Sequence, residues 1–157
     1  MNEKKLKERC VILREMIIRI SGLYNNKDTN DGQKNLIETT IGAALWYLPN
    51  GNDLYTGKIS QEAIGLLIKE KGNLNKLTKE HKFPRKMAGK ELLTNKLSHI
   101  KSSSNVLVKL YKSKYGKFNY VTPAENKRLV KYKTYKKAGI NLISKTMDEL
   151  KNLKKVS

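Results

Sequence analysis

The sequence predicts a mainly helical α+β protein, with an N-terminal helical bundle followed by a small strand-strand-helix motif that carries a helical insertion. Apolar residues recur three or four apart through the first 72 positions, which is typical of helices with one buried face. Two short strand-like runs follow, at 77–83 and 117–121, and the second leads into a Thr-Pro-Ala-Glu helix start at 122–125. The length of 157 residues fits one compact domain with a single core.

Three helices are expected in the first 72 residues. The first spans 3–20, the second spans 33–48, and the third runs from a cap at Ser60 to Gly72. The first helix places its apolar side chains on one side, at Leu6, Cys10, Leu13, Ile17 and Ile20. Region 1–72 is therefore predicted to be a helical scaffold.

Three residues of this scaffold have side chains that can do more than pack. Trp46 and Tyr47 stand at helical spacing beside leucines, which favours a core position over binding of a ligand or a base. Cys10 is the single cysteine, so it can form neither an internal disulfide nor a cysteine zinc cluster. We expect all three to belong to the core.

The pattern of predicted secondary structure changes after residue 72. Pro84 biases the residue before it toward extended geometry, and Thr122, Pro123 and Glu125 have the spacing of a capping box with proline at the first helical position. The expected elements are a strand at 77–83, helices at 86–97 and 103–115, a strand at 117–121 and a helix at 123–137. Region 73–157 is thus predicted as the second, functional region.

The charge of the chain is strongly positive and unevenly spread. Lys and Arg number 33 against 14 Asp and Glu, so the formal net charge is +19. Residues 1–68 are nearly neutral, with a net charge of +1, whereas residues 69–157 carry +18. Such a field attracts phosphates, which favours a nucleic acid as the partner over a solvated lysine-rich face. The basic residues are spread over several elements, which argues against a membrane surface.

Two segments carry the chemistry. The first reads Glu-His-Lys-Phe-Pro-Arg over 80–85, and the second reads Phe-Asn-Tyr-Val-Thr-Pro-Ala-Glu-Asn over 118–126. An imidazole can take a proton from an attacking water near neutral pH, and carboxylate and amide oxygens suit a hard divalent cation. Neighbouring residues on a strand point to opposite faces, so the first two residues of the first segment share a site only if the chain twists there.

These segments, over roughly 77–137, resemble the HNH nucleases of the His-Me finger superfamily, which carry a ββα-metal motif. The resemblance implies a ββα-metal-like motif with a helical insertion and a role for each of four side chains. Glu80 and Asn126 would be the metal ligands, His81 the general base, and Asn119 the side chain that orients His81. The cofactor implied is Mg²⁺, with Mn²⁺ as a substitute.

Basic side chains around these segments are candidates for phosphate binding, and tyrosines are interleaved with them. The candidate ligands of the nucleic-acid backbone are Arg85, Lys86, Lys90, Lys117, Lys127, Arg128 and Lys131. An exposed aromatic ring between residues 111 and 135 could stack on an unpaired base.

The sequence therefore predicts an HNH-type endonuclease, a metal-dependent hydrolase of phosphodiester bonds, acting on DNA. A homodimer or a larger nucleoprotein complex would be compatible with this role. The alternative is a non-catalytic basic nucleic-acid-binding accessory protein in which Glu80 and His81 are structural; a third reading is a ribonuclease that uses His81 without metal. The sequence has neither an apolar run long enough to span a membrane nor a signal region, so we expect the protein to be cytoplasmic.

Overall fold

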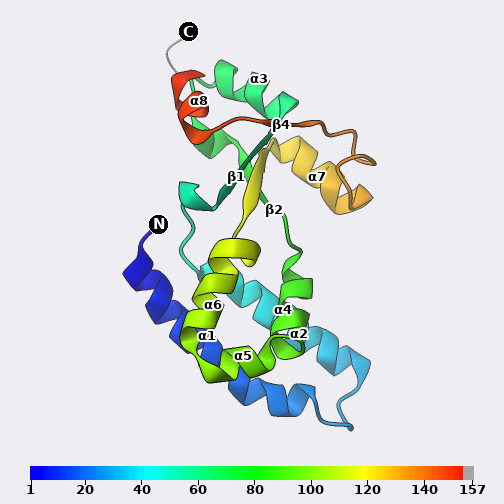
Figure 1. Cartoon of the computed structure of the whole chain (residues 1–157). Coiled ribbons are helices and arrows are strands. Elements are labelled where there is room, and N and C mark those ends of the chain that lie inside the picture. Colours follow the sequence, from blue (N-terminus) through cyan, green and yellow to red (C-terminus); the bar gives the residue numbers. More distant parts are fainter. Residues whose placement is uncertain (154–157) are drawn as a thin grey trace. The chain divides into compact units, whose positions relative to one another are not determined.

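A computed structural model describes residues 1–153, and residues 154–157, the end of the predicted region 73–157, lie outside the described residues. The protein is a mainly helical α+β protein with N-terminal helices and a small four-stranded mixed sheet, so the predicted fold class is confirmed (Figure 1). Within the described residues, none of the helices combines the length and apolar composition needed to cross a bilayer.

The elements follow one another with short connections. The helices are α1 (Glu3–Tyr24), α2 (Asp31–Ala44), α3 (Gln61–Lys69), α4 (Arg85–Leu93), α5 (Leu97–Ser102), α6 (Ser104–Leu110), α7 (Pro123–Tyr132) and α8 (Met147–Asn152). The strands are β1 (Tyr55–Ser60), β2 (Thr78–His81), β3 (Phe118–Val121) and β4 (Leu142–Ser144). A single helical turn, η1 (Leu45–Tyr47), follows α2, and a wider turn, η4 (Tyr111–Tyr115), continues α6.

The chain divides into two compact units, each built from two segments. Unit 1 consists of Met1–Leu54 and His81–Lys117, and unit 2 consists of Tyr55–Glu80 and the described chain from Phe118 onward. This division differs from the predicted boundary after residue 72. The reason is that the inserted helices pack on the N-terminal ones, α4 against α2 and both α5 and α6 against α1.

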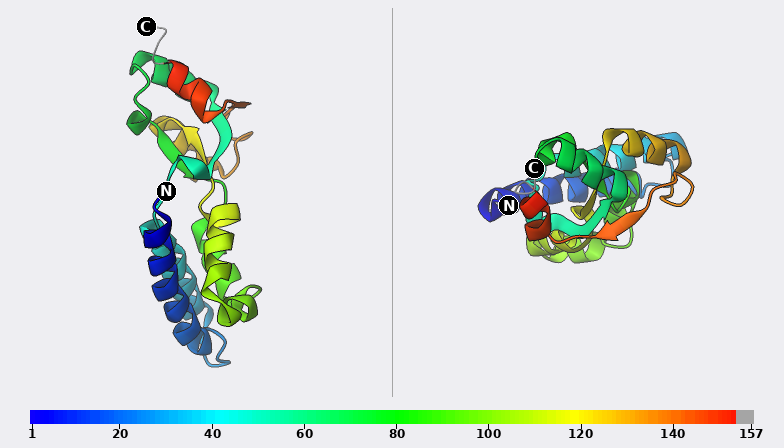
Figure 2. Two further views of the ribbon diagram at one scale, coloured as in Figure 1. Left: turned by 60° about the vertical axis from the view of Figure 1, so that its left-hand side comes forward. Right: turned by 90° about the horizontal axis from the view of Figure 1, so that it is seen from above.

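Unit 1 is a helical assembly with a close contact between two backbones. Figures 1 and 2 both show α1 lying alongside α2 and α6. A Cβ atom added at Gly89 of α4 would lie 2.1 Å from the carbonyl oxygen of Glu38, and one added at Gly42 of α2 would lie 2.3 Å from the carbonyl oxygen of Arg85. Only glycine permits such an approach. The two glycines therefore fix the first turn of α4 against α2.

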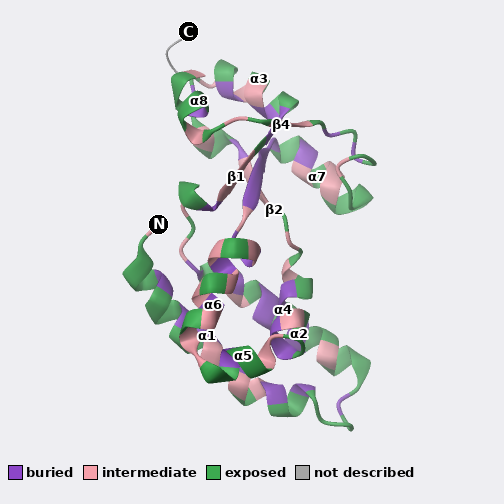
Figure 3. Ribbon diagram, viewed as in Figure 1, coloured by how far each residue is buried: buried purple, intermediate pink, exposed green. Residues whose placement is uncertain are grey.

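Unit 2 is built around β3, whose four residues are all buried (Figure 3). The sheet order is β2-β3-β1-β4, with β1 parallel to β3 and antiparallel to β4. The ring centroid of Tyr55 on β1 lies 5.2 Å from that of Tyr120 and 6.0 Å from that of Phe118. The sheet thus places β2, β3 and α7 in the predicted strand-strand-helix order, with β1 and β4 as additions that the sequence did not indicate.

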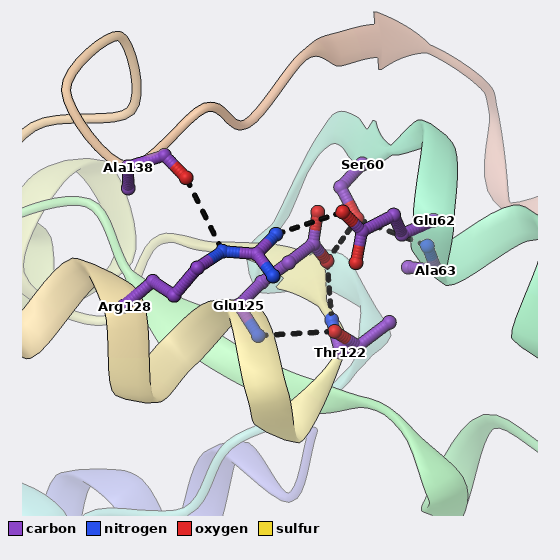
Figure 4. Close-up of polar contacts among 7 residues, drawn as sticks. All are labelled: Ser60, Glu62, Ala63, Thr122, Glu125, Arg128 and Ala138. Carbon is purple, nitrogen blue, oxygen red and sulfur yellow. Dashed lines mark hydrogen bonds and ion pairs between the residues drawn. The ribbon is translucent and has the colours of Figure 1, made fainter.

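A buried carboxylate joins the beginnings of α3 and α7 (Figure 4). Glu125 Oε2 accepts hydrogen bonds from the backbone N–H of Thr122 (2.7 Å) and from Ser60 Oγ (2.5 Å), while Thr122 Oγ1 accepts from the N–H of Glu125 (3.1 Å). Ser60 Oγ also accepts from the N–H of Ala63 (3.0 Å). The predicted capping box of α7 and the predicted cap at Ser60 are both confirmed, and a single cluster links them.

Candidate active site

Glu80, predicted as a metal ligand, lies on β2 at the end of a chain of hydrogen bonds. Its Oε2 accepts a hydrogen bond from the hydroxyl of Tyr135, in the segment after α7. Burial raises the pKa of the Glu80 carboxyl, and the Tyr135 hydrogen bond acts in the opposite direction. Its other oxygen accepts no hydrogen bond within residues 1–153. One carboxylate oxygen is therefore oriented by the protein, and the other remains available to a ligand.

Asn119 on β3 is the middle member of this chain. Its Nδ2 donates to the hydroxyl oxygen of Tyr135 (2.6 Å), and its Oδ1 accepts from the hydroxyl of Thr56 on β1. Burial and the neighbouring carboxylate of Glu80 raise the pKa of Tyr135, so its hydroxyl stays protonated and can donate. The hydroxyl of Thr56 thus donates to Asn119, Asn119 donates to Tyr135, and Tyr135 donates to Glu80. Glu80 is the final acceptor of the chain.

The structure therefore brings Glu80 and Asn119 together, through a residue that sequence reasoning missed as a site member. Asn119 was predicted to orient His81, but the hydrogen bonds described for its side chain go to Thr56 and Tyr135. Tyr135 lies 55 residues from Glu80 in the sequence, inside a stretch of alternating tyrosines and lysines. Nothing local distinguishes it from its neighbours, so only the fold could identify it.

His81 belongs to unit 1 and lies in an aromatic and cationic cluster. Arg85 Nη2 lies 2.5 Å from His81 Nε2, and because a guanidinium only donates, Nε2 accepts and the ring carries its proton on Nδ1. The Arg85 guanidinium also stacks on Trp46, with its central carbon 3.8 Å from the ring centroid, and the His81 ring centroid lies 6.1 Å from that of Trp46. Burial lowers the pKa of Arg85 to about 10.

The side chains of Glu80 and His81 engage different units although the residues are consecutive. This is the alternation expected of neighbours on a strand. Of the four residues assigned by resemblance, Glu80, Asn119 and Asn126 lie in unit 2 and His81 lies in unit 1.

The residue types predicted as metal ligands are ones that a hard divalent cation prefers. Asn126, in the first turn of α7, is half-buried, and within residues 1–153 its side chain makes no hydrogen bond. A carboxylate and an amide oxygen are ligands that suit Mg²⁺ or Mn²⁺, but within residues 1–153 no hydrogen bond or shared partner links Asn126 to Glu80. No group of three or more His, Cys, Asp or Glu side chains that could hold a metal occurs in the described part of the chain.

Trp46 and Tyr47 are exposed, so the prediction that they belong to the core is wrong. Their exposed fractions are 66% and 74%. Because α2 ends at Ala44 and η1 tightens the winding, Leu45 and Leu48 occupy the buried positions. The prediction extended the helical spacing beyond Ala44, where α2 already ends, and so placed the two aromatic rings on the buried side.

The predicted phosphate-binding side chains fall into two groups. Lys86, Lys90, Lys127 and Lys131 are exposed. The other three have protein partners. Arg85 stacks on Trp46, Lys117 Nζ donates to the carbonyl oxygen of Asp53 (3.3 Å), and Arg128 contacts Glu62 Oε1 (2.7 Å) and the carbonyl oxygen of Ala138 (3.2 Å), as Figure 4 shows for Arg128.

A groove of about 710 Å³ lies between α1 and α2 in unit 1, and it contains none of the predicted site residues. Its walls are mainly apolar, with Ile12, Leu13, Met16, Tyr47 and Leu48 among them.

Comparison of the chain with protein-family models, with curated proteins and with solved structures found no match to any of the three.

Proposed function

We propose that the protein is a metal-dependent HNH-like endonuclease that hydrolyses phosphodiester bonds in DNA. The observation that carries the proposal is the half-buried hydrogen-bond chain from Thr56 to Glu80, which orients a carboxylate next to His81 in the sequence. A chain of this kind has a clear use if the carboxylate must hold a ligand in a fixed geometry.

The proposed metal ligands belong to β2 and α7. Glu80 and Asn126 would hold Mg²⁺, with Mn²⁺ as a substitute, and Tyr135 and Asn119 would keep the Glu80 carboxylate oriented. The cation, when bound, supplies positive charge to the phosphate that is being attacked.

His81 would act as the general base through Nε2, the nitrogen that lacks a proton. Arg85 occupies that lone pair, so it must release His81 before a water can donate to it. A substrate phosphate is a stronger acceptor for a guanidinium than a neutral imidazole, and it would draw Arg85 away. General-base help of this kind is worth about 10²- to 10⁴-fold in rate.

The charge of the chain supports a polyanionic substrate. The exposed Lys86, Lys90, Lys127 and Lys131 can each neutralise a backbone phosphate, which gives binding that weakens steeply with salt.

The test is cleavage of labelled DNA by the purified protein with Mg²⁺ or Mn²⁺. We expect divalent-dependent cleavage that His81→Ala and Glu80→Gln reduce at least about 100-fold while salt-sensitive binding is retained. His99→Ala is the matched control, because His99 is the other histidine, is exposed on α5 and should leave cleavage unchanged.

The alternative function is a non-catalytic basic nucleic-acid-binding accessory protein. One observation favours it: both predicted catalytic side chains already have protein partners, Arg85 for His81 and Thr56 with Tyr135 for Asn119. Binding without divalent-dependent cleavage of duplex DNA, single-stranded DNA or RNA would select this reading and exclude the endonuclease.

A further inference from the structure

We propose that Trp46 is a stacking platform for an unpaired nucleobase, and that the first turn of α4 receives the adjoining phosphate. The proposal rests on the proposed function for the class of ligand, a nucleic acid, but it does not depend on cleavage. It defines the substrate as single-stranded DNA, or as duplex DNA with a base displaced from the stack.

Trp46 has one face covered and one face open. The Arg85 guanidinium lies over one side of the indole, with its central carbon 3.8 Å from the ring centroid. The residue is nevertheless 66% exposed, so the opposite face is open to solvent. A large aromatic ring held rigid from behind by a cation is the arrangement that single-strand-binding proteins use to stack a base.

Arg85 can serve the phosphate of the same nucleotide. Its Nη2 contacts His81, its Nε is buried without a hydrogen-bond partner, and Nη1 donates to no acceptor within the described residues. An anion placed here would give the guanidinium the charged acceptor that it lacks in unit 1.

The beginning of α4 provides a second, independent observation. Its cap residue is Pro84, which offers no side-chain hydrogen bond, and its first turn has no acidic residue. Instead, the turn begins with Arg85 and Lys86, two cations at the positive end of the helix dipole. This charge arrangement is unfavourable for an isolated nine-residue helix and becomes favourable when a phosphate binds.

A base in a regular duplex cannot reach such a platform, because both of its faces are already stacked on neighbouring pairs. Only an unpaired or extruded base presents a free face. The platform lies in direct ring contact with His81, so the recognised base would be close to the nucleotide whose phosphate is attacked.

Trp46 is the only tryptophan in the chain, so its fluorescence reports on this site alone. We would titrate the full-length protein, with EDTA present, with three DNA probes of equal length: a single strand, the same strand with abasic positions, and a perfect duplex. We expect quenching with the single strand, and little quenching with the abasic strand or the duplex at equal occupancy. Equal quenching by all three probes would overturn the proposal.

Variants test the energetic contribution. Trp46→Ala should weaken single-strand binding about tenfold, because stacking of one base is worth about 1–3 kcal/mol and 1.4 kcal/mol is a factor of ten. Trp46→Phe should restore part of that affinity. Tyr47→Ala is the matched control, since Tyr47 is adjacent and at least as exposed but lines the α1–α2 groove instead. Equal affinity of Trp46→Ala and the unchanged protein would also overturn the proposal.

The binding assay separates this inference from the proposed function. Without divalent cations no cleavage step is measured, so base-dependent quenching would stand even if the protein cut nothing. Conversely, metal-dependent cleavage with no quenching would retain the endonuclease and remove the platform.

Discussion

The surroundings of the candidate functional residues differ between the two units. In unit 1, His81 contacts Arg85 and the exposed Trp46, and the core of that unit is made separately from apolar helix faces and the contact between Gly42 and Gly89. In unit 2, the partners of Glu80 belong to the half-buried hydrogen-bond chain that joins the sheet to the segment after α7. We therefore expect that candidate residues can be replaced with little loss of stability in unit 1, whereas replacing those of unit 2 should lower the free energy of unfolding.

Gly89→Ala, in unit 1, should cause the largest loss in the free energy of unfolding. The added Cβ would lie 2.1 Å from the carbonyl oxygen of Glu38, so α2 and α4 must separate, at a cost of about 3 kcal/mol. The buried Cys10, whose thiol pKa is raised to about 12 by burial, should then react faster with iodoacetamide. Urea denaturation gives the free energy of unfolding.

Gly65→Ala is the control for this substitution. Gly65 is inside α3, and a Cβ there meets nothing within 4 Å, so alanine should stabilise unit 2 by about 0.5–1 kcal/mol. A loss of stability equal to that of Gly89→Ala would show that the close helix contact is not the cause.

Ser60→Ala should produce the next largest effect, and in unit 2. It removes the cap of α3 and one donor to the buried Glu125, which together are worth about 2–3 kcal/mol. Denaturation followed by circular dichroism measures the loss, and the Cys10 alkylation rate should stay unchanged. Faster alkylation would mean that the two units do not unfold separately.

Tyr135→Phe should cost about 1–2 kcal/mol, because Asn119 Nδ2 loses its acceptor and Glu80 loses its donor. Tyr132→Phe, which removes the hydroxyl of an exposed ring on α7, is the matched control and should be neutral. If the proposed function holds, Tyr135→Phe should also reduce cleavage, so stability and activity fall together in unit 2.

Trp46→Ala tests the same comparison in unit 1, where little change in stability is expected. The side chain is exposed, and its main loss is the contact with Arg85, so the free energy of unfolding should change by less than about 1 kcal/mol. Thermal or urea denaturation checks this, alongside the binding assay. A larger loss of stability would place Trp46 among structural residues and contradict this expectation for unit 1.

The smallest effect should be a pH dependence at α8. The N–H and hydroxyl of Thr146, with Lys145, lower the pKa of Glu149 to about 2 from the usual 4.5. A lowered pKa in the folded state stabilises above the unfolded value, so this contribution is present above pH 4.5 and is lost as the pH falls toward 2. Glu149 is exposed, so salt should weaken the effect, and NMR titration of its carboxyl with and without salt measures it.

The sequence predicted α1, α2, α3 and the beginning of α7 well because their signals are local, whereas α5 and α8 were missed. Apolar spacing identified α1 and α2, and the capping-box residues identified the first turn of α7. β1 was missed because Tyr-Thr-Gly-Lys-Ile-Ser contains a glycine and polar residues, and it becomes a strand only by pairing with β3 and β4. β4 was missed because three residues are too short to show a period.

The candidate site was predictable only in part, for the same reason. The Glu-His pair and the two asparagines lie in the two segments from which the site was predicted, but Tyr135 and Thr56 reach Glu80 and Asn119 through tertiary contacts at separations of 55 and 63 residues. Trp46 was assigned to the core because helical spacing does not reveal that α2 ends two residues earlier.

The interleaving of the two units has a consequence for synthesis on the ribosome. α1 and α2 emerge early, but the helices that cover them lie in 81–117, so unit 1 cannot be completed until that stretch has left the exit tunnel. β1 and β2 emerge before then, while their shared neighbour β3 begins only at Phe118. The nascent chain must therefore carry two unpaired strands while its helices assemble, an interval in which strand edges are exposed to aggregation or to a chaperone.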